Sequence, residues 1–275
     1  MMGRLGCLSY VNVLPIYQGI LHGAVSWSGE LVCAPPQTLN RKLLEGEIHI
    51  GPVSSIEFAR HQGDLVLVPP FCIASTGDVS SVTLCSRVPL GDIRSVAVPG
   101  TSATSIALLK ILLSDNGLLF EAYDPGSVSD GALERADAVL RIGDPALREA
   151  ALQEGYSYDL GGLWQERIGA PMVYCLWAAH RDFLEKAPEQ AGEMKGILEA
   201  SHYWGKSHMG EVIASASRRL GLNRQAMERY FRGLTYTLAP EIAEGLLRFF
   251  SEAASLGLCP DVRDLSPGDP HHCAV

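Results

Sequence analysis

The sequence has 275 residues, of which 47% are hydrophobic and 19% charged, and its formal net charge is −9 at pH 7. These values suit two lobes of about 100–150 residues each, and they exclude a disordered chain or a coiled coil. The sequence shows no basic run and no apolar stretch of about 18 residues, so we expect neither a nucleic-acid partner nor insertion into a membrane.

Strand-like and helical patterns alternate in the first third of the chain. We expect, in order, a strand at 4–8, a helix at 15–21, a strand at 31–34, a helix at 36–44, a strand at 48–50, a helix at 52–61 and a strand at 65–68. A long β-rich run follows at 79–86. This alternation is typical of an α/β protein with a largely parallel sheet.

A second set of elements follows the β-rich run. We expect a strand at 95–98, a helix at 102–113, a strand at 138–142, a helix at 145–154 and a second β-rich run at 172–179. From residue 181 onward the pattern is mostly helical, and the last helix spans 240–256.

The two β-rich runs enclose a compact α/β segment, which indicates two lobes joined by two crossings of the chain. We expect residues 1–82 and 176–275 to form lobe one, and residues 83–175 to form lobe two. Folds of this kind bind ligands in the cleft between the lobes, at the carboxyl ends of strands.

Four expected strand-to-helix turns share one chemistry, because small polar residues stand where each helix opens. The turns are at 9–12, 51–55, 99–105 and 143–145. Free backbone N–H groups and hydroxyls at helix starts bind carboxylates without an arginine. The candidate residues for binding a small carboxylated ligand are Ser9, Ser54, Ser55, Ser102, Thr104 and Ser105.

Ordinary helix capping is the alternative for each of these hydroxyls, because serine and threonine are favoured cap residues. The segment 101–105 carries four hydroxyls where a cap needs only one, which favours ligand binding at that helix start. Asp144, at the fourth turn, is different because a carboxylate there repels an anionic ligand. We expect Asp144 to be a cap, an anchor for a ligand hydroxyl or a catalytic polar group.

The sequence contains no recognisable motif for binding a metal or a cofactor. The sequence has no glycine-rich phosphate loop and no metalloprotease or nucleophile-elbow motif, and its histidines show no metal-ligand spacing. His271, His272 and Cys273 are too isolated to predict a metal site, so we expect neither a metal nor a cofactor. Seven cysteines without a Cys-x-x-Cys pair favour reduced thiols and a cytoplasmic location.

Several segments at these turns resemble chorismate dehydratases of the futalosine route to menaquinone. The matching segments are LGCLSYVNVLP (5–15), IGPVSSIE (50–57), SSV (80–82), SATS (102–105), IGDPAL (142–147) and DLGGLW (159–164). The resemblance runs in consistent order from about residue 4 to residue 257, with departures from the family pattern at 76–80 and 168–174. It implies a type II periplasmic-binding-protein fold, used by the family for catalysis.

The resemblance also implies an activity and two catalytic residues. Family members remove water from chorismate to give 3-[(1-carboxyvinyl)oxy]benzoate, and their catalytic asparagine and serine match Asn12 and Ser81. Neither residue is a strong base, and the family implies that the enolpyruvyl carboxylate of the substrate takes the ring proton. Glu57 and Asp144 are alternative bases. Helix capping for Asn12 and an ordinary strand hydroxyl for Ser81 are the competing interpretations.

Two other functions stay open at this point. The sister enzyme of the same route, 1,4-dihydroxy-6-naphthoate synthase, shares the fold, and a non-catalytic protein could bind a small carboxylate in the same cleft. The segments SYVN (9–12) and GPVSS (51–55) favour the dehydratase.

Overall fold

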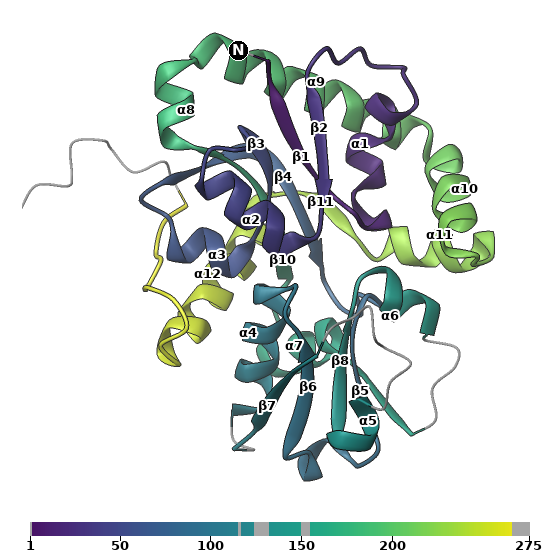
Figure 1. The fold of residues 1–275 in the computed structure, drawn as a ribbon. Helices are drawn as coiled ribbons and strands as arrows, with labels where there is room; N and C mark the ends of the chain where they lie inside the picture. The colour runs from purple at the N-terminus through teal and green to yellow at the C-terminus, as the bar shows by residue number, and fades with distance from the viewer. Residues whose placement is uncertain (1, 115–116, 124–131, 150–154, 266–275) are drawn as a thin grey trace, which may run out of the picture.

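The computed structural model describes residues 2–114, 117–123, 132–149 and 155–265, which form two α/β lobes, each built on its own sheet (Figure 1). The first sheet has the order β11 (Thr235–Thr237), β4 (Leu65–Ser75), β10 (Met172–His180), β3 (Ile50–Ser54), β1 (Arg4–Leu8) and β2 (Glu30–Ala34). The second has the order β7 (Leu119–Tyr123), β6 (Ser95–Pro99), β8 (Ala138–Ile142), β5 (Val82–Ser86) and β9 (Tyr156–Asp159). The prediction of a two-lobed α/β fold is confirmed.

Helices flank both sheets. With the first sheet lie the 3-10 helix η1 (Val11–Val13), α1 (Leu14–Leu21), α2 (Pro36–Leu44), α3 (Ser55–Arg60), α8 (Arg181–Lys186), α9 (Pro188–Ser207), α10 (Met209–Leu220), α11 (Arg224–Arg232) and α12 (Pro240–Ser255). With the second lie the 3-10 helix η2 (Leu90–Asp92), α4 (Ala103–Leu112), α5 (Ala132–Arg135), α6 (Asp144–Glu149) and α7 (Leu160–Ile168). Helix α1 packs on α9, and α12 packs on β10.

The chain passes between the lobes twice, at residues 76–81 between β4 and β5 and at residues 169–171 between α7 and β10. The predicted boundary at 175/176 falls inside β10, which pairs with β4 in the first sheet from Met172 onward. Val82, which the prediction assigned to lobe one, opens β5 of the second sheet. We therefore propose that lobe one contains residues 2–75 and 172–265, and that lobe two contains the described residues 82–114, 117–123, 132–149 and 155–168.

Both sheets are mixed, so the prediction of a largely parallel sheet is wrong. Strand β1 is parallel to β2 and β3, and β6 is parallel to β7 and β8. Strand β10 is antiparallel to β3 and β4, and β5 is antiparallel to β8 and β9. The crossings explain this pattern, because β5 and β10 start at the boundary between the lobes, whereas β3, β4 and β8 end there.

Strand β3 also differs from the prediction. Pro52, expected to open a helix, lies within β3 opposite Trp177, and α3 begins only at Ser55. Proline suits the first turn of a helix, but it also fits a strand at a position whose N–H is not needed by the ladder. The predicted turn at 51–55 is therefore mostly the end of a strand, and it delivers Ser54 to the edge between the lobes.

Other elements also differ from the prediction. The sequence patterns do not predict the strands β7, β9 and β11 or the helices α5 and α7. The strand expected at 65–68 extends to Ser75 as β4. The helix expected at 145–154 is present as α6 up to Glu149. Residues 150–154 lie outside the described residues, and so do His271, His272 and Cys273.

A buried polar chain fixes the position of α1. The indole Nε1 of Trp177 on β10 donates to the Tyr17 hydroxyl at 2.8 Å, and Tyr17 donates to the Gly6 carbonyl on β1. Trp177 and Tyr17 are both fully buried. Buried tryptophan and tyrosine side chains need partners for their polar atoms. The chain therefore ties α1 to β1 and β10, and with it the turn that carries Asn12.

Candidate functional site

A pocket lies between the two lobes, with an empty volume of about 550 Å³ that includes its solvent-open part. Lobe one contributes the β1–α1 turn, α2 and the end of β3, and lobe two contributes the starts of α4 and β5 and the end of β8. Its polar lining includes Asn12, Asn40, Ser54, Ser81, Ser102 and Ser105. A few converging polar groups in a partly apolar pocket between two lobes are typical of a small-molecule site.

Asn12 presents an unsatisfied oxygen at this pocket. It lies within η1, and neither the residue before η1 nor the residue before α1 makes a side-chain cap bond. Its Oδ1 is buried and has no hydrogen-bond partner within the described part of the chain. Because buried polar atoms are usually paired, this oxygen is available to a donor on a ligand. The structure thus gives no support to a capping role for Asn12.

Ser81 lies at the crossing into the second lobe and is 4% exposed. Its carbonyl accepts a hydrogen bond from the Gly143 N–H at 2.7 Å, which joins the crossing to the end of β8. Its hydroxyl hydrogen-bonds to the phenol of Tyr230, whose pKa is raised by burial. The Ser81 side chain is therefore held between α11 and the pocket.

The start of α4 carries more hydroxyls than its cap uses. Ser102 occupies the cap position, but its side chain makes no cap hydrogen bond. Its Oγ lies 3.0 Å from the Oγ of Ser105, and both residues are buried and line the pocket. The free N–H groups of the first turn and this hydroxyl pair make a local donor site for an anion. Such a site can hold a carboxylate in a protein of net negative charge.

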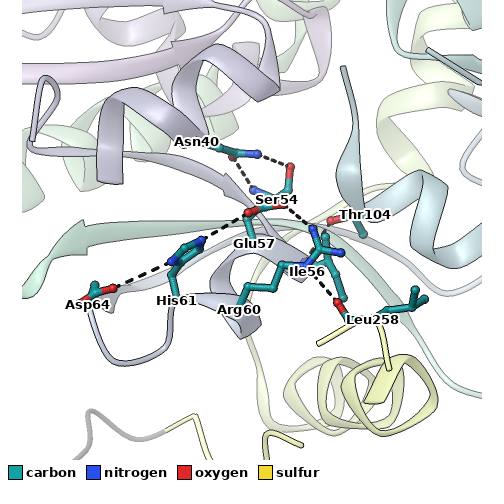
Figure 2. Close-up of polar contacts among 9 residues, drawn as sticks. All are labelled: Asn40, Ser54, Ile56, Glu57, Arg60, His61, Asp64, Thr104 and Leu258. Carbon is teal, nitrogen blue, oxygen red and sulfur yellow. Dashed lines mark hydrogen bonds and ion pairs between the residues drawn. The ribbon is translucent and has the colours of Figure 1, made fainter. Parts of the chain in front are cut away.

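Ser54 is oriented by Asn40, a residue that sequence reasoning missed (Figure 2). The Asn40 Nδ2 donates to Ser54 Oγ at 3.1 Å, and the Ser54 N–H donates to Asn40 Oδ1 at 3.0 Å. Since the Ser54 oxygen accepts from Asn40, its own proton is free to point at a ligand. Asn40 lies on α2 and is 7% exposed. The signal in the sequence was a polar residue among the apolar positions Leu39 and Leu43, which predict the buried face of this helix.

Three predicted binding residues do not line the pocket. Ser55 donates to the Val173 carbonyl at 2.8 Å, and the Ser9 carbonyl accepts from Arg219. Thr104 Oγ1 accepts from the Ile56 N–H at 3.2 Å, which joins α4 of lobe two to α3 of lobe one (Figure 2). Their observed contacts hold the scaffold and join the lobes.

Asp144 also connects the lobes and does not line the pocket. Its Oδ1 accepts from the buried Val11 N–H at 2.9 Å, and its Oδ2 lies 3.5 Å from Arg219 Nη2. Burial raises the pKa of this carboxyl, and the bond from Val11 and the charge of Arg219 oppose that shift. Both partners of the Asp144 carboxylate are therefore residues of lobe one, and the carboxylate ties the two lobes together.

Glu57 lies in a separate, wider groove formed by α2, α3 and α4, which does not include Asn12 or Ser81. Its carboxylate is paired with Arg60 at 2.7 Å and lies 3.7 Å from His61 Nε2 (Figure 2). We place the candidate site in the smaller pocket, because the polar groups there converge and include an unpaired oxygen, whereas Glu57 is already paired.

Two tyrosines in the pocket were missed by sequence reasoning. Tyr10 hydrogen-bonds to Thr101 and packs on Gly143, where an added Cβ would lie 2.9 Å from the ring. Gly143 has a φ of +68°, so both its conformation and this contact require glycine. Tyr174 follows Val173 on β10, and its hydroxyl lies 3.1 Å from Ser75 Oγ. Tyr10 lies in the turn at 9–12, where only Ser9 and Asn12 were named as candidates, and Tyr174 lies in the β-rich run at 172–179, which resembles a core strand.

Metal clusters and membrane-spanning helices are not found among the described residues. No group of three or more His, Cys, Asp or Glu side chains in the described ranges could hold a metal ion. No helix within those ranges is long and apolar enough to cross a membrane.

The fold assigns the chain to a class of proteins. The alkanesulfonate-binding protein of Xanthomonas axonopodis pv. citri, solved with bound MOPS, matches with a TM-score of 0.66 and 14% identity over 94% of each chain. A solved protein of Archaeoglobus fulgidus matches with a TM-score of 0.76 and 21% identity, over 93% of this chain and 97% of that one. The two lobes with a pocket between them therefore define a periplasmic-binding-protein-like fold.

The sequence defines the family within that class. Residues 3–255 match a family described as "Menaquinone biosynthesis". The chorismate dehydratase of Thermus thermophilus is 33% identical over an alignment of 273 residues, which covers 93% of this chain and 96% of that protein. The chain belongs to this menaquinone biosynthesis family.

Proposed function

We propose that the protein is a chorismate dehydratase, a hydro-lyase that converts chorismate to 3-[(1-carboxyvinyl)oxy]benzoate and water. The observation that carries the proposal is that Asn12 of lobe one and Ser81, at the crossing into lobe two, line one pocket. The similarity to the Thermus enzyme supports the same reaction.

Binding of the substrate is the first task of the pocket. Chorismate carries two carboxylates, whereas the chain has a net charge of −9. Local donors must therefore overcome an unfavourable overall field. The start of α4 with Ser102 and Ser105, and the Ser54 hydroxyl across the cleft, supply such donors from both lobes.

The elimination breaks two bonds on neighbouring ring carbons. A proton leaves the carbon that bears the enolpyruvyl ether, the electron pair forms a new ring double bond, and the adjacent hydroxyl departs with a proton as water. The ring becomes aromatic. Negative charge that develops on the ring can spread into the ring carboxylate, so donors aimed at that carboxylate stabilise the transition state more than the ground state.

Asn12 and Ser81 orient the reacting groups in this proposal. The enolpyruvyl carboxylate of the substrate takes the ring proton, because neither side chain is a strong base. The Asn12 amide N–H groups hold that carboxylate, and its unpaired Oδ1 accepts from the substrate hydroxyl. The Ser81 hydroxyl, which lines the same pocket, donates to the departing oxygen. Enclosure between the lobes keeps these groups aligned.

The test is conversion of chorismate by the purified protein, followed by mass spectrometry. We expect a product lighter by one water, with the absorbance of an aromatic ring, and no product from Ser81→Ala at the same concentration. Chorismate that binds unchanged would instead indicate a binding protein, and chorismate that neither binds nor reacts would indicate another substrate, as for 1,4-dihydroxy-6-naphthoate synthase.

The proposal includes a cytoplasmic location. The six cysteines within the described residues are free thiols. Reduced cysteines are typical of proteins that work in the reducing environment of the cytoplasm.

A further inference from the structure

The residue before Ser81 adopts an unusual backbone conformation. Among the described residues, Ser80 is the one non-glycine residue with a positive φ, at 59°. The left-handed region is unfavourable for a residue with a side chain, and such a conformation persists where the surroundings impose it. Something must therefore hold Ser80, and the orientation of Ser81 depends on it.

The carboxylate of Asp159 holds this segment. Its Oδ2 accepts from the Ser80 N–H at 2.6 Å, and its Oδ1 accepts from the Val79 N–H at 3.0 Å. The same Oδ1 caps α7 by accepting from Gly161 and Gly162 at 2.8 and 3.2 Å. A cap alone would use only the two glycine N–H groups. The bonds to Val79 and Ser80 go beyond that requirement and reach the crossing.

The two glycines at the start of α7 let the crossing approach. A Cβ at Gly161 would lie 2.5 Å from the Gly77 carbonyl oxygen, and a Cβ at Gly162 would lie 2.2 Å from Asp78 Oδ1. A larger residue at position 161 would push the backbone of the crossing away from the helix, whereas one at position 162 would displace the Asp78 side chain. The segment DLGGLW, which the proposed mechanism does not otherwise use, thus leaves space for residues 77–78 and accepts hydrogen bonds from residues 79–80.

We infer that Asp159 is a positioning residue, whose carboxylate holds Ser80 in the left-handed conformation so that the Ser81 hydroxyl faces the pocket. The inference rests on the proposed function, because it assigns Asp159 a task in orienting a residue of that reaction. Asp159 does not line the pocket, so it acts through the backbone and not on the substrate.

The variant Asp159→Asn separates positioning from capping. Asparagine caps helices about as well as aspartate, so its oxygen keeps the bonds to Gly161 and Gly162. Its NH₂ group then faces the Ser80 N–H, and two donors cannot hydrogen-bond. We expect kcat for chorismate to fall about 100-fold, the effect of a misplacement of about 1 Å, while KM changes less than about threefold.

The matched control is Asp137→Asn. The Asp137 carboxylate also accepts from two consecutive backbone N–H groups, those of Arg94 and Ser95 at 2.9 Å, but at the start of β6 away from the pocket. We expect this variant to keep the wild-type kcat within about twofold, as for an interaction that does not change in the transition state. Equal losses of kcat in the two variants would overturn the inference.

A rescue experiment completes the test. In Asp159→Asn/Ser80→Gly, glycine adopts the left-handed conformation without the hydrogen bond to the Asp159 carboxylate. The value of kcat should therefore recover about tenfold relative to Asp159→Asn. Absence of rescue would overturn the inference. Should Asp159→Asn fail to fold, Ser80→Val provides the test at an exposed position, and an unchanged kcat there would overturn it.

Failure of the proposed function is recognised separately. If the wild-type protein does not convert chorismate, amide hydrogen exchange alone tests whether the Asp159 carboxylate holds the segment at 79–80. Exchange at Ser80, whose N–H loses its acceptor, should accelerate in Asp159→Asn and stay unchanged in Asp137→Asn. Unchanged exchange in Asp159→Asn would show that the carboxylate does not hold this segment.

Discussion

Replacing Asp144 with alanine removes a contact between the lobes. Its Oδ1 accepts from the Val11 N–H at 2.9 Å, and Val11 is fully buried. Alanine leaves this N–H unpaired, which costs the arrangement of the lobes in this structure about 2 kcal/mol. The Arg219 side chain is 41% exposed, so its ion pair with Asp144 adds less than about 1 kcal/mol. A change of 1.4 kcal/mol corresponds to a tenfold change in an equilibrium constant. The equilibrium constant for closure of the lobes into the arrangement seen here should therefore fall by about 30-fold.

Two measurements check this estimate, kcat/KM for chorismate and the radius of gyration of the ligand-free protein from X-ray scattering. Asp144→Ala should lower kcat/KM by about 30-fold and enlarge the free protein. Asp144→Asn keeps an acceptor for Val11 and loses only the ion pair, so it should lose less than about fivefold. Equal losses in the two variants, or no loss in Asp144→Ala, would refute the assignment of Asp144 to closure.

Two further predictions concern packing and thiol reactivity. A Cβ at Gly205 of α9 would lie 2.2 Å from the Pro15 carbonyl oxygen, so Gly205→Ala should lower the free energy of unfolding in urea by about 1–3 kcal/mol, whereas Gly196→Ala on the same helix meets nothing within 4 Å and should raise it. A hydrogen bond with the Cys7 thiol lowers the pKa of exposed Cys33 to about 6, with help from a nearby arginine. The rate of alkylation of Cys33, followed by mass spectrometry, should therefore be half-maximal near pH 6 and reach its plateau about one to two pH units above that value. A rate that still rises near pH 8.5, the ordinary thiol pKa, would contradict this.

Much of the fold follows from local patterns in the sequence. Strand 138–142 is observed with its predicted bounds as β8, and helix 36–44 as α2. The strand β8 begins with three buried apolar residues, and α2 opens with Pro36 and buries Leu39 and Leu43, so local preference and packing agree. Pro52 misled the analysis because proline marks a helix start and also fits a strand, and only the pairing with β10 decides between the two.

The site was predictable to a smaller degree. The sequence brings Asn12, Ser54, Ser81, Ser102 and Ser105 to attention, and the structure places all of them around one pocket. Their roles stay predictions, since capping and ligand binding use the same residue types.

The contacts between the lobes could not be derived from the sequence. Thr104 bonds to Ile56 and Asp144 bonds to Val11, and each pair is distant in the sequence. Local patterns carry no information about such pairs. The order of the strands and the two crossings create them, so they become visible only with the complete fold.

The most direct test of the central claim compares turnover and binding in Asn12→Ala. The account holds that the Asn12 amide aligns the enolpyruvyl carboxylate with the ring proton, so kcat for chorismate should fall at least about 100-fold while Kd changes less than about threefold. A loss of binding that accounts for the whole loss of kcat/KM, or wild-type turnover in the variant, would contradict the account.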